Sequence, residues 1–366
     1  MMRRRERSAR PAPPDGAQPR VPWVHAIAER WSELIGDHAE RDRIVDVVGR
    51  ALMPSTAENY GRHFGRFVDW CERQPDKPSP LPASTGTVLR WLAADVTAGG
   101  AVAAQSLQGY LSALNSIHAD LDFELPALGH LVRRFRAGLA HEQADRGRDA
   151  MRVYLPPPVV SRLLDWALAL DLRRKPPRVQ FAFRAAVATV FTFVFFARGA
   201  TGAKLRVKDV RRSVAGLTVT LDHEKGKRQL KWGRTITIPP GSVPGLEELL
   251  DKWEAFRGDD LKPDEGYYAL PWAERKRAFS TSAINDWLAE ALAQLDDVAP
   301  PEGDAWTGHS LRKGAASGSA AEGVPLDRTC WMGGWSVQSR VVFDYIDPTC
   351  PQTAASRRFF GWLRPA

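Results

Sequence analysis

The chain has 366 residues, and its 51 Lys and Arg against 43 Asp and Glu give it a formal net charge of +8 at pH 7. A chain of this length is expected to form two domains, because single hydrophobic cores seldom grow beyond about 250 residues. The basic excess favours a polyanionic partner such as nucleic acid, although charge alone leaves an ordinary basic protein open. Cys71, Cys330 and Cys350 form no paired motif, which argues against a disulfide scaffold or a zinc site and fits a reducing compartment.

The first part of the chain is predicted to be an arm followed by a helical domain. Residues 1–21 are rich in Arg and Pro without an apolar core, so we interpret them as a disordered basic arm and not as a secretory signal. Residues 22–141 carry apolar stripes at helical spacing. Helices are expected near 55–73, 85–97, 103–118 and 127–140. Residues 142–153 are charged and lack apolar periodicity, which predicts a linker.

Residues 154–366 are predicted to form a second domain that mixes helices with a few strands. Two segments, 217–221 and 234–238, alternate with period two and are expected to be half-buried strands, joined by the polar tip 222–233. The apolar run 185–197 is too short to span a membrane, so we expect a core helix and no membrane partner. Helices are predicted near 158–170, 179–197, 243–256, 280–294, 309–322, 326–332, 337–345 and 351–362.

The most informative stretch lies near the C-terminus and places four chemically useful side chains within 37 residues. His309 and Arg312 share one face of a helix at i and i+3, where they can present two donors to one phosphate. Trp335 and Tyr345 follow one short element later, and Arg198 lies upstream. Each residue alone has an ordinary structural explanation, such as a surface pair or a core aromatic. Their combination is what carries the hypothesis.

These residue types match the requirements of cutting DNA with a tyrosine. A phenol attacks the phosphate, and cations stabilise the charge on its non-bridging oxygens. Arginine suits this clamp because its planar fork stays charged and matches a phosphate bidentately. A lysine can act as the acid for the leaving 5′-oxygen, because neighbouring cations lower its pKa into a useful range. Lys225 on the polar tip is the candidate acid, and Lys227 is the alternative.

The order and spacing of these motifs resemble the tyrosine recombinases of the phage integrase family, most of all the Cre-type branch. The resemblance covers about residues 50–362 and rests mainly on the segments 305–316, 333–336 with 345–346, and 198 with 205–210. Three departures stand out. Thr201 stands where the family usually has an acidic residue, Trp335 stands where most members have His, and Trp335 and Tyr345 are ten positions apart, one more than is common.

The resemblance implies a mainly α fold: an all-helical N-terminal core-binding domain and an α+β catalytic domain with a small antiparallel sheet, together forming a C-shaped DNA clamp. It implies a site-specific DNA recombinase that cleaves and rejoins duplex DNA through a 3′-phosphotyrosyl intermediate and a Holliday junction, without a cofactor or a metal. Tyr345 would be the nucleophile, Arg198 and Arg312 the phosphate clamp, His309 the base and a phosphate contact, Trp335 a further phosphate contact and Lys225 the general acid.

The same resemblance implies a homotetramer on double-stranded DNA sites with inverted-repeat arms around a spacer, and a C-terminal helix exchanged between protomers. Such a protein would act at the nucleoid in the cytoplasm, or in the nucleus of a eukaryotic host. The residues predicted to contact DNA are Arg62, Arg66, Gln105, Gln108, Arg133, Arg134, Arg206 and Lys227. Two alternatives stay open: a type IB topoisomerase or telomere resolvase, and a catalytically silent DNA-binding protein derived from a recombinase, which Thr201 invites.

Overall fold

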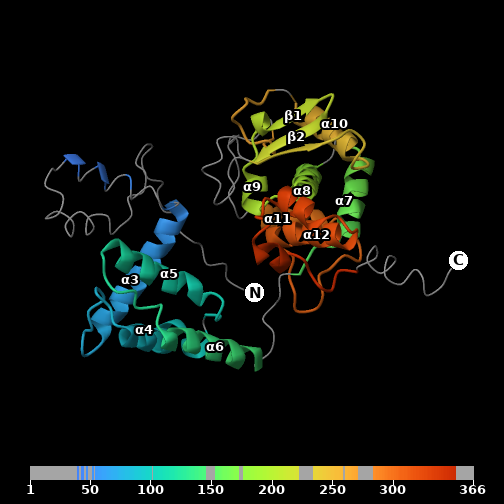
Figure 1. Cartoon of the computed structure of the whole chain (residues 1–366). Coiled ribbons are helices and arrows are strands. Elements are labelled where there is room, and N and C mark those ends of the chain that lie inside the picture. The colour runs from blue at the N-terminus through green and yellow to red at the C-terminus, as the bar shows by residue number, and fades with distance from the viewer. Residues whose placement is uncertain are drawn as a thin grey trace. The chain divides into compact units, whose positions relative to one another are not determined.

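A computed structural model describes most of the chain, which forms two compact units, residues 1–148 and 149–366 (Figure 1). The boundary between the units falls inside the segment 142–153 that was predicted as a linker. The described residues are 54–100, 102–145, 153–172, 176–221, 234–258, 260–270 and 283–351, with a few positions between 39 and 52. The predicted basic arm and the predicted C-terminal helix beyond residue 351 lie outside them.

The described part of the first unit is entirely helical. Its elements are α3 (Pro54–Arg73), α4 (Thr85–Trp91), a π-helical turn (Leu92–Val96), a 3₁₀ turn (Ala98–Gly100), α5 (Leu107–Asp120) and α6 (His130–Asp145). The apolar stripes meet in one core, in which Phe67 and Trp91 are fully buried. Helix α6 continues to Asp145, so its last turn extends into the predicted linker.

A buried histidine joins two segments of this unit. His118 on α5 is fully buried, and its Nδ1 lies 2.8 Å from the Leu114 carbonyl oxygen. The backbone N–H of Ala83 donates to its Nε2 over 2.9 Å. Because an N–H can only donate, Nε2 must be unprotonated and the proton must sit on Nδ1. Burial lowers the pKa of His118, although the bond to Leu114 acts in the opposite direction.

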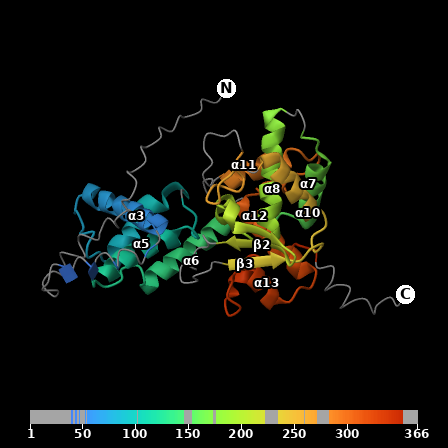
Figure 2. The same ribbon diagram turned by 90° about the horizontal axis from the view of Figure 1, so that it is seen from above.

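The second unit is built around one buried helix, α8 (Pro177–Val194), as Figures 1 and 2 show. Its neighbours are α7 (Pro157–Ala169), α9 (Gly199–Ala203), α10 (Leu246–Arg257), α11 (Ala283–Leu292) and α12 (Gly308–Ala321). Every residue from Ala185 to Thr192 is buried, as predicted for a core helix. After α12 come α13 (Leu326–Gly333) and a 3₁₀ turn (Arg340–Asp344), which replaces the helix expected over 337–345.

A three-stranded antiparallel sheet completes the unit in the order β1 (Val210–Ser213), β2 (Gly216–Leu221) and β3 (Arg234–Ile238). The alternate residues of β2 and β3 are buried against the helical core. The fold class is therefore confirmed as mainly helical with a small antiparallel sheet. Among the described residues, no helix is long and apolar enough to cross a membrane.

Candidate active site

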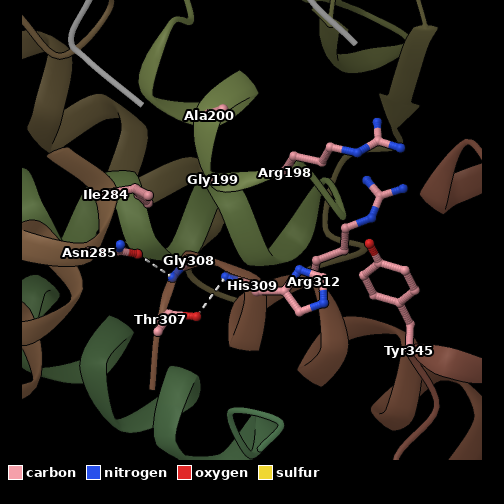
Figure 3. A pocket seen from close by; sticks show the side chains of 10 residues that line it. All are labelled: Arg198, Gly199, Ala200, Ile284, Asn285, Thr307, Gly308, His309, Arg312 and Tyr345. Carbon is pink, nitrogen blue, oxygen red and sulfur yellow. Dashed lines mark hydrogen bonds between the residues drawn. The ribbon is translucent and has the colours of Figure 1, made fainter. Parts of the chain in front are cut away.

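Four predicted site residues from three separate segments line one cavity of the second unit (Figure 3). Arg198 precedes α9, His309 and Arg312 lie in the first turns of α12, and Tyr345 follows the 3₁₀ turn. The guanidinium groups of Arg198 and Arg312 lie near each other, and the phenol oxygen of Tyr345 points toward them (Figure 3). The cavity has a volume of about 250 Å³. It therefore places two cations, an imidazole and a phenol around one small space.

Arg312 is the most firmly held of these residues, with only 1% of its surface exposed. Its Nη1 donates to the Phe196 carbonyl oxygen over 2.6 Å, and its Nη2 donates to the Gly333 carbonyl oxygen. Its Cζ lies 4.3 Å from the ring centroid of Trp335 and 5.4 Å from that of Tyr345. A cation over an aromatic face is attracted by the ring quadrupole, most strongly when it is desolvated. One guanidinium thus ties three segments of the site together.

Tyr345 is half-buried between aromatic neighbours. Its ring centroid lies 4.8 Å from that of His309 and 4.8 Å from that of Trp335. Trp335 is buried and does not itself line the cavity. Within the described residues its indole Nε1–H has no hydrogen-bond partner. An unsatisfied buried donor is costly, so this group has the capacity to bond an oxygen that the chain does not supply.

The closeness of Arg198 and His309 follows from the glycine beside each of them. A Cβ atom on Gly199 would lie 3.3 Å from the Gly308 Cα and 2.5 Å from the Cγ2 of Ile284. A Cβ on Gly308 would lie 2.6 Å from the same methyl group. Either Cβ would therefore displace the Ile284 side chain, and it would also crowd the backbone of the other glycine. The close packing of Gly199, Gly308 and Ile284 thus depends on the absence of a side chain at both glycines.

Two further residues fix the start of α12 and were not predicted from the sequence. The Asn285 side chain accepts a hydrogen bond from the Gly308 N–H over 2.8 Å, and Thr307 is the N-cap of α12 (Figure 3). The Ser310 side chain bonds back to the Thr307 N–H over 3.0 Å, which completes a capping box. The Thr-x-x-Ser spacing was a readable signal for this cap. Nothing in the sequence alone marked Asn285.

Thr201, which stands where the family has an acidic residue, is buried in α9 with 4% of its surface exposed. Its backbone N–H donates to the Arg198 carbonyl oxygen over 2.8 Å. Its side chain supplies a hydroxyl and no negative charge. The chain therefore supplies no negative charge at this position.

The two candidate acids, Lys225 and Lys227, lie in 222–233, outside the described residues. The base of that segment is described, because β2 ends at Leu221 and β3 begins at its register partner Arg234. Arg234 is buried, and its Nη1 lies 3.4 Å from the Phe195 carbonyl oxygen, three residues before Arg198. Arg234, the first described residue after that segment, therefore contacts the part of the chain that leads to Arg198.

The residues predicted to contact DNA in the first unit differ in the hydrogen bonds and ion pairs that they make within the unit. Arg66 is engaged within the unit: its Nε lies 2.7 Å from the Asp95 carboxylate, and its Nη2 donates to the Asp95 carbonyl oxygen over 2.9 Å. Arg62 donates to the Asn59 side chain. Gln108 donates to the Ser112 hydroxyl over 3.0 Å. Gln105, Arg133 and Arg134 are exposed.

In the second unit, Arg206 holds the buried carboxylate of Asp209 with two parallel bonds, 3.0 and 3.1 Å long. Its side chain is 19% exposed. A phosphate contact from Arg206 would therefore have to share its guanidinium with Asp209. Among the described residues, no group of three or more His, Cys, Asp or Glu side chains is arranged to hold a metal ion.

Comparison with known proteins gives three informative similarities. The chain is 23% identical to recombinase Cre of Escherichia phage P1 over 312 residues, which cover 80% of this chain and 83% of the phage protein. The solved structure of the site-specific recombinase XerH on difH DNA, a post-cleavage complex, superposes with a TM-score of 0.56 at 13% identity, covering 93% of this chain and 90% of XerH. The chain has the tyrosine-recombinase fold.

A second solved structure supports the same fold. The Tn1549 transposon integrase, in complex with transposon right end DNA, superposes with a TM-score of 0.51 at 10% identity, covering 92% of this chain and 99% of that one. No protein-family model matches the sequence. At these identities the similarity establishes the fold, and what each site residue does must be argued from the site itself.

Proposed function

We propose that this tyrosine-recombinase relative is a site-specific DNA recombinase that cleaves and rejoins duplex DNA with Tyr345 as the nucleophile. One observation carries the proposal: Arg198, His309, Arg312 and Tyr345 line the same cavity, although Arg198 and Tyr345 are far apart in the sequence. A phenol beside two guanidinium groups suits attack on a phosphodiester, because the cations stabilise the charge that builds on the phosphate oxygens. The formal net charge of +8 fits a nucleic-acid substrate.

In this reaction the scissile phosphate lies between Arg198 and Arg312. The oxygen of Tyr345 attacks phosphorus, forms a phosphotyrosyl bond at the 3′ end and displaces the 5′-oxygen. His309 accepts the phenol proton and also bonds the phosphate, since its ring lies 4.8 Å from that of Tyr345, centroid to centroid. The indole N–H of Trp335 bonds a phosphate oxygen. Lys225, or Lys227 in its place, protonates the departing 5′-hydroxyl.

The phosphotyrosyl bond keeps the energy of the broken phosphodiester, so rejoining requires neither ATP nor a metal. We further propose that four protomers assemble on two duplex sites with inverted-repeat arms, exchange strands in pairs and pass through a Holliday junction. The exposed cations Arg133 and Arg134 on α6 are proposed to contact the DNA backbone. Such a protein acts where its DNA is, at the nucleoid or in the nucleus of a eukaryotic host.

The decisive experiment traps the covalent intermediate. The DNA flanking the gene is sequenced for inverted repeats, and a duplex carrying them is nicked so that a short 5′-hydroxyl fragment is lost after cleavage. We expect a protein–DNA adduct on a denaturing gel, and we expect Tyr345→Phe to abolish it while site binding stays within a few-fold, because affinity comes from many phosphate contacts. Tyr268→Phe removes a buried phenol oxygen of the same unit that lies outside the cavity and has no hydrogen-bond partner among the described residues, and it should leave the adduct unchanged.

The other outcomes separate the alternatives. An adduct from Tyr345→Phe would show that another residue is the nucleophile. Relaxation of supercoiled plasmid without inverted repeats would favour the topoisomerase. Specific binding with no adduct from the native protein would favour the silent DNA-binding protein, and the buried Thr201 would then be the first residue to examine.

A further inference from the structure

The chain segment that follows Tyr345 is fastened to α12, the helix that carries His309 and Arg312. The hydroxyl of Ser317 on α12 donates to the Tyr345 carbonyl oxygen over 3.2 Å and accepts from the Asp347 N–H over 2.8 Å. Ser317 is fully buried, and Asp347 is 4% exposed. One hydroxyl therefore holds the backbone on both sides of residue 346.

A buried ion pair reinforces this attachment. The Nζ of Lys313 lies 2.8 Å from one oxygen of the Asp347 carboxylate, and the two side chains are 12% and 6% exposed. The other carboxylate oxygen accepts from the backbone N–H of Thr349 over 3.0 Å and from its hydroxyl over 2.7 Å. Burial by itself would raise the pKa of Asp347, but the bonds from Lys313 and Thr349 hold it below its usual value. Lys313 and Ser317 are at i and i+4, so they share one face of α12.

The local structure before Tyr345 gives the phenol little independent support. Tyr345 follows a 3₁₀ turn of five residues, Arg340–Asp344, in which only Val342 is buried. Short 3₁₀ turns have poor hydrogen-bond geometry and little stability of their own. The Tyr345 N–H bonds to the Val342 carbonyl oxygen over 3.0 Å. The contacts on its C-terminal side therefore give the Tyr345 backbone support that the turn does not provide, in addition to the ring contacts with His309 and Trp335.

An ion pair buried in this way is not an efficient means of stabilising a fold. Removing two charges from water costs free energy, and their mutual attraction often does no more than offset that cost. Well-packed apolar residues in the same place frequently stabilise a fold equally well. A pair that joins the segment after Tyr345 to the helix of Arg312 does fix a geometry, because the oxygens of Asp347 are bonded in defined directions. This observation favours a role in placing Tyr345 over a role in stability alone.

We propose that Lys313, Ser317 and Asp347 are positioning residues that set the reach of the Tyr345 phenol toward the phosphate held by Arg312. The inference rests on the proposed function and assigns residues that the cavity itself does not contain. A misplacement of about 1 Å can cost on the order of 10²-fold in rate. Loosening the attachment should therefore slow attack by Tyr345 without weakening the phosphate clamp.

The test compares two nucleophiles on the same site. Asp347→Asn keeps the shape of the side chain and removes its charge, and we expect adduct formation on the nicked duplex to fall by at least about tenfold. In a Tyr345→Phe background, hydrogen peroxide is supplied as the nucleophile, so that cleavage depends on the clamp and not on the phenol. There Asp347→Asn should change the rate by less than about twofold. Lys252→Met removes a lysine that bonds the Ala167 and Leu168 carbonyl oxygens, and it serves as the control for a general loss of stability.

A double-mutant cycle gives an independent reading of the pair. If Lys313 and Asp347 act as a unit, the variant carrying both Lys313→Met and Asp347→Asn should form the adduct no more slowly than the slower single variant. Additive losses would show that the two residues act separately and would overturn the proposal.

The remaining outcomes are equally decisive. Unchanged adduct formation by Asp347→Asn, with a native protein that does form the adduct, would refute the positioning role and leave the proposed function intact. Equal losses with Tyr345 and with peroxide would show that the pair supports the clamp or the whole unit. A native protein that forms no adduct would refute the proposed function itself.

Discussion

Replacing Arg198 and Arg312 with alanine should have the same effect on cleavage and different effects on stability. Each variant loses one cation of the clamp, so each should cut on the order of 10²-fold more slowly or worse, as the loss of one oxyanion donor does in other enzymes. Only Arg312 is deeply buried, however, with its donors engaged by Phe196 and Gly333. Arg198 is partly exposed.

The size of the difference follows from these contacts. Each buried carbonyl that loses its donor costs roughly 1–3 kcal/mol, and the desolvated contact of Arg312 with Trp335 is worth about 2 kcal/mol. Removing the guanidinium also removes its own desolvation cost, so we expect a net loss of about 3 kcal/mol. For a unit of this size that corresponds to a decrease in Tm of roughly 6–12 °C. Arg198→Ala should lower the Tm by less than Arg312→Ala does, because the Arg198 side chain is only partly buried whereas Arg312 is almost fully buried.

The assay pairs thermal unfolding of the two variants, followed by circular dichroism, with adduct formation well below the lower Tm. Equal decreases in Tm would show that the buried hydrogen bonds of Arg312 carry no special weight. Near-native cleavage by either variant would remove that residue from the clamp.

Three further predictions concern other residues. Trp335→Phe keeps an aromatic face beside Arg312 and loses the indole N–H. Cleavage should therefore fall by roughly tenfold or more, which corresponds to the loss of one hydrogen bond to a charged group. An unchanged cleavage rate would show that Trp335 has only a packing role. Lys225→Ala should cleave ordinary DNA slowly, and its cleavage rate should recover on a substrate with sulfur at the bridging 5′ position, because a thiolate leaves without a proton. Recovery by Lys227→Ala instead would assign the acid to Lys227. Because burial lowers the pKa of His118, its ring binds fewer protons in the fold than in the unfolded chain, so stability should fall as the pH drops below about 6.5. Burial and two arginines lower the pKa of His63 in the same direction, so the measurement is urea unfolding at several pH values, compared between the native protein and His118→Gln. An equal pH dependence in the two proteins would show that His118 makes no contribution.

The helices were the most predictable part of the fold, because their apolar periodicity directly reflects a buried face. The buried run from Ala185 to Thr192 lies where the sequence predicted a core helix. The first strand was missed, since Val210–Ser213 is only four residues long and mostly exposed, so it shows no alternation. The expected helix over 337–345 is only a 3₁₀ turn, because apolar spacing alone does not distinguish one turn from several.

Site residues that carry a chemical group of the reaction were predictable from the sequence. Residues that hold those side chains in place were less predictable. Arg198, His309, Arg312 and Tyr345 were identified from the sequence, and all four line the cavity. Asn285 was not, because it acts through a single contact to the backbone of another segment. Sequence spacing does not report such contacts, which exist only after the chain has folded.

The paired glycines also determine which changes this protein can accept. Gly199 and Gly308 pack directly against each other without side chains between them, and the methyl group of Ile284 contacts both. An alanine at either position would press on the Ile284 methyl group. Any backbone shift in response would move the neighbouring Arg198 or His309, although neither of these residues is changed. A smaller residue at position 284 would leave space for a methyl group at position 199 or 308. A laboratory library that aims to redirect this protein to new DNA should therefore vary these three positions together or leave all of them fixed.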